Sequence, residues 1–213
     1  MSKVWIERWQ TGRTGWHEPG GNAGLRAHWD KVRAGREVLV PLSGASPDLL
    51  WLADAGHAVT GIELSDIAVQ FFFEESGLAY TVDNSGPLPA YRAADVEITI
   101  YQGDYFAFPG TGFEALYDRG ALVALPADRR PAYVAKTRQC LDSDPGCLLV
   151  TLEYDQARVD GPPFAVMPEE IGEYWPGLQR VEARDDLETS PPKFREAGLD
   201  DLYEVFWLKA STR

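Results

Sequence analysis

Residues 37–64 read EVLVPLSGASPDLLWLADAGHAVTGIEL, and this stretch decides the fold class. Its first part, EVLVPL (37–42), is a continuous apolar run of strand length, as expected of a strand covered on both faces. Ser46, which is followed by a proline, is typical of a helix start, and Gly56 is a natural helix end. HAVTGIEL (57–64) predicts a second strand, so the stretch reads as a strand–helix–strand unit.

The same alternation continues along the chain. Further strands are predicted at 97–104, 113–120, 146–154, 178–187 and 202–210. A helix is expected at 127–142, and 79–95, which contains two prolines, is expected to be an irregular surface excursion. The last two predicted strands have no long helix between them, so we expect them to form an antiparallel hairpin at one edge. The fold class that follows is α/β, with a doubly wound, mostly parallel sheet.

The composition restricts the class of protein. The chain has 213 residues, with 20 Lys and Arg against 33 Asp and Glu, and a formal net charge of -13. This balance argues against nucleic acid and against an anionic membrane face as partners, because both bind clustered cations. The sequence has no apolar run long enough for a membrane span and no signal-peptide pattern, so we expect a cytoplasmic protein. The two cysteines and three scattered histidines have no metal-ligand spacing, and a monomer is the default.

In open parallel sheets a ligand binds beyond the carboxyl ends of the strands. Gly44 follows the first strand, where it either lets a ligand approach the backbone or simply makes a tight turn. Glu63 ends the second strand, 19 residues later. Its carboxylate can accept both hydroxyls of a ribose, or it is an ordinary loop acid at a helix start.

Two further strand ends carry polar residues. Asp104 either accepts the amino group of an adenine or stabilises a turn. Arg119 either orients an anionic group or pairs with Asp118 or another nearby acid. Neither GxGxxG nor a P-loop motif is present, so the pattern suits a nucleoside without a pyrophosphate. S-adenosylmethionine is the commonest such ligand.

The sequence resembles the thiopurine S-methyltransferase family. The resemblance rests on motifs that occur in order along nearly the whole chain: WIERWQTGRTGWHE (5–18), the stretch 38–75 with VPLSG and GIELS, YQGDYFAF (101–108), LYDRGALVALP (116–126), LEYDQ (152–156) and GPPFAV (161–166). It implies a class I S-adenosylmethionine-dependent methyltransferase with a seven-stranded sheet. It also implies one domain over 1–213, in which a helical lid at 1–35 closes over a Rossmann-like core at 36–213.

The resemblance also assigns residues. The positions expected to bind the cofactor are Trp5, Trp9, Leu42, Gly44, Glu63, Leu64, Asp104, Tyr105 and Arg119. Arg119 and its neighbour Asp118 are the expected catalytic residues. The positions expected to line the pocket of a small-molecule acceptor are Trp16, His17, Lys193 and Arg195. His17 either sits over the acceptor as a base or makes hydrogen bonds within its loop.

Two departures from the family pattern concern the acceptor. The family usually has VPLCGKS after the first strand, whereas this chain has Ser43 and Ala45 in place of the Cys and Lys. The missing Lys favours a neutral or cationic acceptor over an anionic one. The expected reaction is in-line transfer of a methyl group to a thiol or other sulfur nucleophile. Methylation of a thioether, a selenium or tellurium species, a halide or a metabolite N or O is the first alternative, and non-catalytic cofactor binding is the second.

Overall fold

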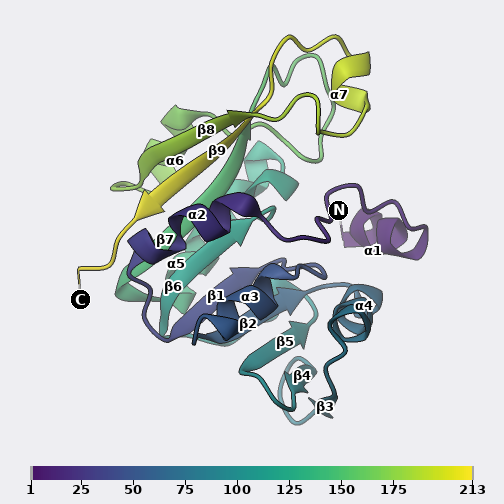
Figure 1. Ribbon diagram of the computed structural model, residues 1–213, viewed down its shortest axis with the longest axis vertical. Coiled ribbons are helices and arrows are strands. Elements are labelled where there is room, and N and C mark those ends of the chain that lie inside the picture. The colour runs from purple at the N-terminus through teal and green to yellow at the C-terminus, as the bar shows by residue number, and fades with distance from the viewer. Residues whose placement is uncertain (1, 213) are drawn as a thin grey trace.

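The computed structural model describes residues 2–212 as a single mixed sheet with helices on both faces (Figure 1). The helices are α1 (Ser2–Gln10), α2 (Ala23–Val32), α3 (Asp48–Asp54), α4 (Asp66–Ser76), α5 (Arg130–Cys140), α6 (Pro168–Tyr174) and α7 (Lys193–Glu196). The strands are β1 (Glu37–Pro41), β2 (Ala58–Glu63), β3 (Tyr80–Asp83), β4 (Ala90–Ala93), β5 (Ile98–Gln102), β6 (Phe113–Arg119), β7 (Leu141–Glu153), β8 (Gln179–Asp185) and β9 (Tyr203–Lys209). Short 3-10 helices occupy Tyr105–Ala107, Leu122–Ala124 and Ala127–Arg129.

The strand order is β3-β4-β5-β2-β1-β6-β7-β9-β8. The five strands from β5 to β7 are parallel, and β9 runs antiparallel between β7 and β8. The predicted doubly wound parallel sheet and its antiparallel edge hairpin are therefore confirmed. Strand order reverses at β1, whose neighbours β2 and β6 lead to opposite halves of the sheet. This switch point is where a ligand site is expected.

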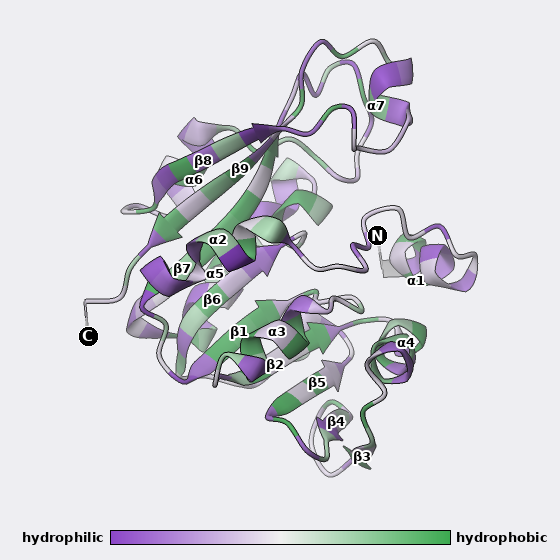
Figure 2. Ribbon diagram, in the orientation of Figure 1, coloured by the Kyte–Doolittle hydropathy of each residue, from purple (hydrophilic) through white to green (hydrophobic). Residues whose placement is uncertain are grey.

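The first strand is apolar on both faces because both faces are covered. Val38 and Val40 pack in one hydrophobic cluster with Trp29 of α2 and Leu49 of α3. Leu39 points the other way and packs in a second cluster that includes Tyr133 of α5. Figure 2 shows the hydrophobic colour concentrated on β1, whereas the outlying α7 is mostly hydrophilic. The continuous apolar run of the sequence is thus the signature of a buried central strand.

Two segments differ from the sequence-based expectation. Residues 79–95 form a hairpin, β3 and β4, which extends the expected seven strands to nine. The two strands are four residues each, too short to give a clear pattern, and the prolines lie in the loop that joins them. Tyr80 and Tyr91 hold the hairpin against Phe73 of α4, with ring centroids 4.4 and 6.4 Å from the Phe73 ring.

The second difference lies between α5 and β7. The helix expected at 127–142 covers only Arg130–Cys140, and β7 begins directly at Leu141 rather than at 146. Leu141 pairs with Phe113 of β6, and the register then shifts before the regular pairing resumes at Gly146. Residues 142–144 between these two pairings are polar, so the sequence has no apolar strand pattern there and the start of β7 was not predicted.

The ends of α4 and the state of the two cysteines follow from local features. Ser65 caps α4 by accepting a hydrogen bond from the Ala68 amide, and Gly77 ends that helix in the left-handed conformation. Cys140 and Cys147 are buried free thiols. Within residues 2–212, no helix is both long and apolar enough to cross a bilayer.

The close contact between α2 and β9 gives a first prediction. A Cβ atom on Gly24 would lie 1.9 Å from the ring of Phe206, whereas one on the exposed helical Gly172 would meet nothing within 4 Å. We expect Gly24→Ala to lower the free energy of unfolding by about 1–3 kcal/mol through overpacking. Gly172→Ala, the matched control, raises it by up to about 1 kcal/mol because alanine favours a helix. Urea unfolding of both variants measures the two changes, and equal midpoints would contradict the packing argument.

Candidate functional site

The carboxyl ends of the central parallel strands surround a cavity of ≈220 Å³. The helix α1 and the loop that follows it form its roof, and the turns after β1, β2, β5 and β6 form its floor. The structure brings together eleven of the residues singled out in the sequence, all of which line this cavity: Trp5, Trp9, Trp16, His17, Leu42, Gly44, Glu63, Leu64, Asp104, Tyr105 and Arg119.

Glu63 is the buried anchor of the floor. One of its carboxylate oxygens accepts a hydrogen bond from the Gly44 amide at 2.8 Å, and the other accepts one from the Ser65 amide at 2.7 Å. Burial raises the pKa of Glu63, and these backbone N–H groups act against that rise. Each oxygen keeps one lone pair, so the carboxylate can still accept hydrogen bonds from two further donors such as vicinal hydroxyls.

The turn after β1 adopts left-handed backbone conformations. Gly44 has φ 57°, and Leu42 has φ 48°, which is uncommon for a residue with a side chain. The Ser43 amide donates to the carbonyl of Ile62 at 3.0 Å, which ties the turn to β2. A Cβ atom on Gly44 would lie 3.6 Å from the Trp9 ring, so the glycine keeps the space between the turn and the roof open.

Aromatic side chains build the roof. The Trp16 ring lies edge-on to Trp5 and Trp9, at centroid distances of 5.0 and 6.0 Å. The guanidinium of Arg8 lies 5.0 Å from the centre of the Trp5 ring. By contrast α2, the second helix of the expected lid, packs against the sheet through Leu25 and other buried residues. The roof therefore consists of α1 and the loop 11–22.

The expected adenine-side pair has two different environments. Asp104 is exposed, and one of its oxygens accepts from the Phe106 amide at 3.0 Å. Tyr105 is buried, and its hydroxyl shares a hydrogen bond with Thr137 of α5 at 2.9 Å. The Tyr105 hydroxyl is thus held by the core, and this residue offers the cavity its ring.

A second, wider cavity of ≈940 Å³ adjoins the first. Trp16, His17 and Arg119 line both cavities, so they lie at the junction. The His17 ring packs edge-on against Phe71, at a centroid distance of 5.8 Å. Burial, followed by the charge of Arg119, lowers the pKa of His17. Its imidazole is therefore neutral at pH 7.

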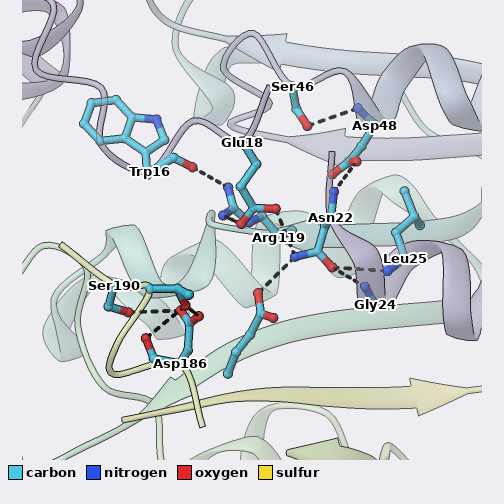
Figure 3. Close-up of polar contacts among 12 residues, drawn as sticks. Trp16, Glu18, Asn22, Gly24, Leu25, Ser46, Asp48, Arg119, Asp186 and Ser190 are labelled. Atoms are coloured by element: carbon cyan, nitrogen blue, oxygen red, sulfur yellow. Dashed lines mark hydrogen bonds and ion pairs between the residues drawn. The ribbon is translucent and has the colours of Figure 1, made fainter. Parts of the chain in front are cut away.

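Arg119 makes an ion pair with a residue that the sequence analysis did not single out. Its guanidinium donates to the Trp16 carbonyl at 2.7 Å and pairs with the carboxylate of Glu18 (Figure 3). Burial disfavours the charged guanidinium, but the Glu18 carboxylate and other acidic groups nearby, among them Glu204, together outweigh this and raise the pKa of Arg119. Of the two roles open for Arg119, the ion pair with an acid is the one seen here, with Glu18 rather than Asp118 as partner.

Asp118 is not brought to either cavity. It is fully buried, and it accepts hydrogen bonds from the amides of Ala121 and Leu122 and from the Tyr133 hydroxyl. Because successive residues of a strand point to opposite faces, Arg119 and Asp118 diverge. The structure therefore gives Asp118 a supporting position, in which it fixes the turn after β6, rather than the catalytic position expected from the sequence.

Lys193 and Arg195, the two basic residues predicted to line the acceptor pocket, also lie in different places. Lys193 lines the wider cavity, and its ammonium donates to the carbonyls of Asp160 and Pro162, at 3.0 Å each. Arg195 of α7 lines neither cavity, and it donates to backbone carbonyls of the segment before that helix, among them Leu187 at 2.7 Å. The expected place of Arg195 in the acceptor pocket is thus not supported, because its guanidinium is used to fold residues 187–190.

Sequence reasoning missed other lining residues. Glu18 and Arg8 reach the site from the roof, and the apolar turn after β6 contributes Val123, Ala124 and Leu125. Two signals were available for that turn: its position beyond a strand end, and its place within the motif LYDRGALVALP (116–126). Within the described range 2–212, no group of three or more His, Cys, Asp or Glu side chains is placed to hold a metal ion.

Sequence comparison identifies close relatives. A family model described as thiopurine S-methyltransferase (TPMT) matches residues 1–211. The thiopurine S-methyltransferase of Bordetella petrii is 41% identical over 211 residues, which is 94% of each chain. That of Aliivibrio fischeri strain MJ11 is 41% identical over 210 residues, which is 97% of each chain.

Solved structures with a similar fold are more distant in sequence. The 1,6-didemethyltoxoflavin-N1-methyltransferase of Burkholderia thailandensis, with bound S-adenosylhomocysteine, gives a TM-score of 0.59 at 16% identity, over 99% of this chain and 87% of that one. The magnesium protoporphyrin IX methyltransferase of Synechocystis PCC 6803 gives a TM-score of 0.59 at 13% identity, over 98% of this chain and 99% of that one. This likeness establishes the class I methyltransferase fold.

The burial of Asp118 predicts a pH dependence of stability. Burial raises its pKa from 3.8 to about 6, so the folded state holds this proton more tightly than the unfolded chain does. The stabilisation from Asp118 is complete below about pH 4 and is lost as pH rises through 6. We expect wild type to lose about 2–3 kcal/mol of unfolding free energy relative to Asp118→Asn between pH 4 and 7.

Urea unfolding across that pH range measures the difference. The exposed Asp128→Asn is the control for the loss of one negative charge. A constant difference between wild type and Asp118→Asn over the whole range would refute the prediction.

Proposed function

The chain belongs to the thiopurine S-methyltransferase family and is an S-adenosylmethionine-dependent methyltransferase; from this premise we propose that it methylates the sulfur of a small, thiopurine-like aromatic thiol. The fold and the relatives support small-molecule methylation in general. That the acceptor is a thiol is the more specific part of the proposal. We propose further that the ≈220 Å³ cavity holds the cofactor and that the wider cavity receives the acceptor.

The cofactor assignment rests on the hydrogen bonds that the Glu63 carboxylate makes and on those that it can still accept. The carboxylate is held between two backbone amides and retains one lone pair on each oxygen, which suits the two hydroxyls of a ribose. Gly44 leaves the approach from the roof open. Asp104 and Tyr105, at the end of β5, then border the place of the adenine.

The bound cofactor supplies a methyl group that its sulfonium sulfur already activates. The aromatic rings of Trp5 and Trp9 favour a cation beside them and exclude water from the cavity. The main task of the remaining residues is to orient the acceptor within reach of the methyl group. An aromatic thiol is largely ionised at neutral pH and needs no strong base. For a less acidic thiol, the neutral imidazole of His17 is at the junction and can accept the proton.

The role of Glu63 gives a testable prediction. In Glu63→Gln a side-chain NH₂ group replaces one of the two carboxylate oxygens that accept a hydrogen bond from a backbone N–H. Two hydrogen-bond donors, the NH₂ group and that backbone N–H, then face each other. We expect the affinity for S-adenosylhomocysteine, measured by calorimetric titration, to fall about 10- to 100-fold. Glu74→Gln, an exposed acid on α4, is the control and leaves the affinity unchanged. Wild-type affinity in Glu63→Gln would place the ribose elsewhere.

The acceptor class is tested by a substrate panel. Purified protein with S-adenosylmethionine is offered an aromatic thiol, a thioether, selenite, tellurite, iodide and an aromatic amine, and the formation of S-adenosylhomocysteine is followed. We expect kcat/KM for the thiol to exceed that for every other acceptor by at least about tenfold, since positioning favours one geometry of attack. Faster turnover of another acceptor would refute the thiol assignment. Cofactor binding without any turnover would indicate a non-catalytic protein.

A further inference from the structure

Arg119 is a cation at the junction of the two cavities. It ends β6, and its side chain is 21% exposed. The guanidinium is thus mostly withdrawn from bulk water while it lines both the smaller and the wider cavity. A guanidinium in such a place attracts anionic groups strongly, because water screens it poorly.

The protein itself occupies this cation. The Trp16 carbonyl accepts from one terminal nitrogen of Arg119, and the Glu18 carboxylate pairs with the other (Figure 3). Both partners come from the loop 11–22 of the roof, about 100 residues away in sequence. The net charge of the Glu18–Arg119 pair at the junction is zero.

The Glu18 carboxylate has a second partner besides Arg119, the side chain of Asn22. Its second oxygen accepts a hydrogen bond from the side-chain amide of Asn22 at 3.4 Å, and the same amide donates to Glu204 at 2.9 Å. The backbone amide of Asn22 donates to the buried Asp48 at 2.8 Å, and Asp48 accepts in turn from Tyr117 of β6. This network fixes the far end of the loop, so the carboxylate is positioned against Arg119 by the fold (Figure 3).

We propose that Glu18 is a specificity-determining residue, which neutralises Arg119 at the cavity junction and so makes the site select aromatic thiols without a charged substituent over thiols that carry an additional anionic substituent. The inference rests on the proposed function, because it concerns the acceptor of the same site. Removing the charge of Glu18 takes away the carboxylate that pairs directly with Arg119. The positive charge beside the acceptor is then less compensated, with Glu204 as the remaining acid of the wider cavity that acts on it. The preference should then shift toward the anionic acceptor.

The test compares two acceptors of similar size, 4-methylbenzenethiol and 4-mercaptobenzoate. Their dissociation constants are measured by calorimetry on the complex with S-adenosylhomocysteine, and their kcat/KM values are measured with S-adenosylmethionine. We expect Glu18→Gln to shift both ratios about five- to tenfold toward 4-mercaptobenzoate. The ratio is independent of the fraction of folded protein, so loss of stability alone does not move it.

Two further variants make the test specific. Glu18→Asp keeps the charge, and we expect its ratios to stay within about twofold of wild type. Glu97→Gln removes an equally charged, ion-paired acid on the exposed surface, and we expect it to change nothing. If Glu18→Gln lowers the affinity and kcat/KM for both acceptors by the same factor, Glu18 has only a structural role and the proposal is overturned.

The two proposals fail in different ways. If wild type binds both thiols but transfers no methyl group, and Glu18→Gln still shifts the binding ratio, the proposed function fails and the role of Glu18 holds. If wild type methylates thiols and Glu18→Gln leaves both ratios unchanged, the role of Glu18 fails alone. If neither thiol binds to wild type, both proposals are refuted.

Discussion

The rest of the site depends on the carboxylate of Glu63. It is nearly buried at the end of β2, and it accepts hydrogen bonds from the turn after β1 and from the start of α4. A buried carboxylate is costly unless it is well bonded, and here the bonds are to backbone amides that cannot move away. The turn after β1 is consequently fixed in the left-handed conformations of Leu42 and Gly44. A single polar residue thus sets the floor of the cavity and the backbone strain beside it.

The roof is fixed in a different way. Its polar connection to the core runs through Arg119 to Trp16 and Glu18 and through Asn22 to Asp48. Its apolar connection is the packing of Trp9 and His17 on Phe71 of α4. Its packing is aromatic and comes from residues close in sequence, among them Trp5, Trp9 and Trp16. The roof is thus held by a few polar contacts and by aromatic packing on α4. This division suits a site that must admit a charged cofactor and then exclude water.

The small residues after β1 fit the same arrangement. Ser43 is buried beside Gly61, where a Cβ atom on that glycine would lie 2.9 Å from the Ser43 hydroxyl oxygen. Ala45 is also buried and contributes to the hydrophobic cluster under α3. The turn that usually carries a Cys and a Lys in this family is therefore tightly packed and uncharged here. Together with the ion pair of Arg119, this leaves little free positive charge at these positions of the smaller cavity.

The sequence by itself determined the central sheet, the placement of Gly44 and Glu63 at adjacent strand ends, and the helix cap at Ser65. These features depend on local signals: apolar runs of strand length, capping residues and the known polarity of strand–helix units. Only the tertiary structure decided the partner of Arg119, the burial of Asp118 away from the cavities, the bonding of Arg195 to the segment before α7, and the hairpin at β3 and β4. Each of these depends on contacts between segments distant in sequence, or on strands too short to leave a pattern. A charged side chain chooses its partner by distance and burial in the folded chain, and the sequence around it carries no record of either.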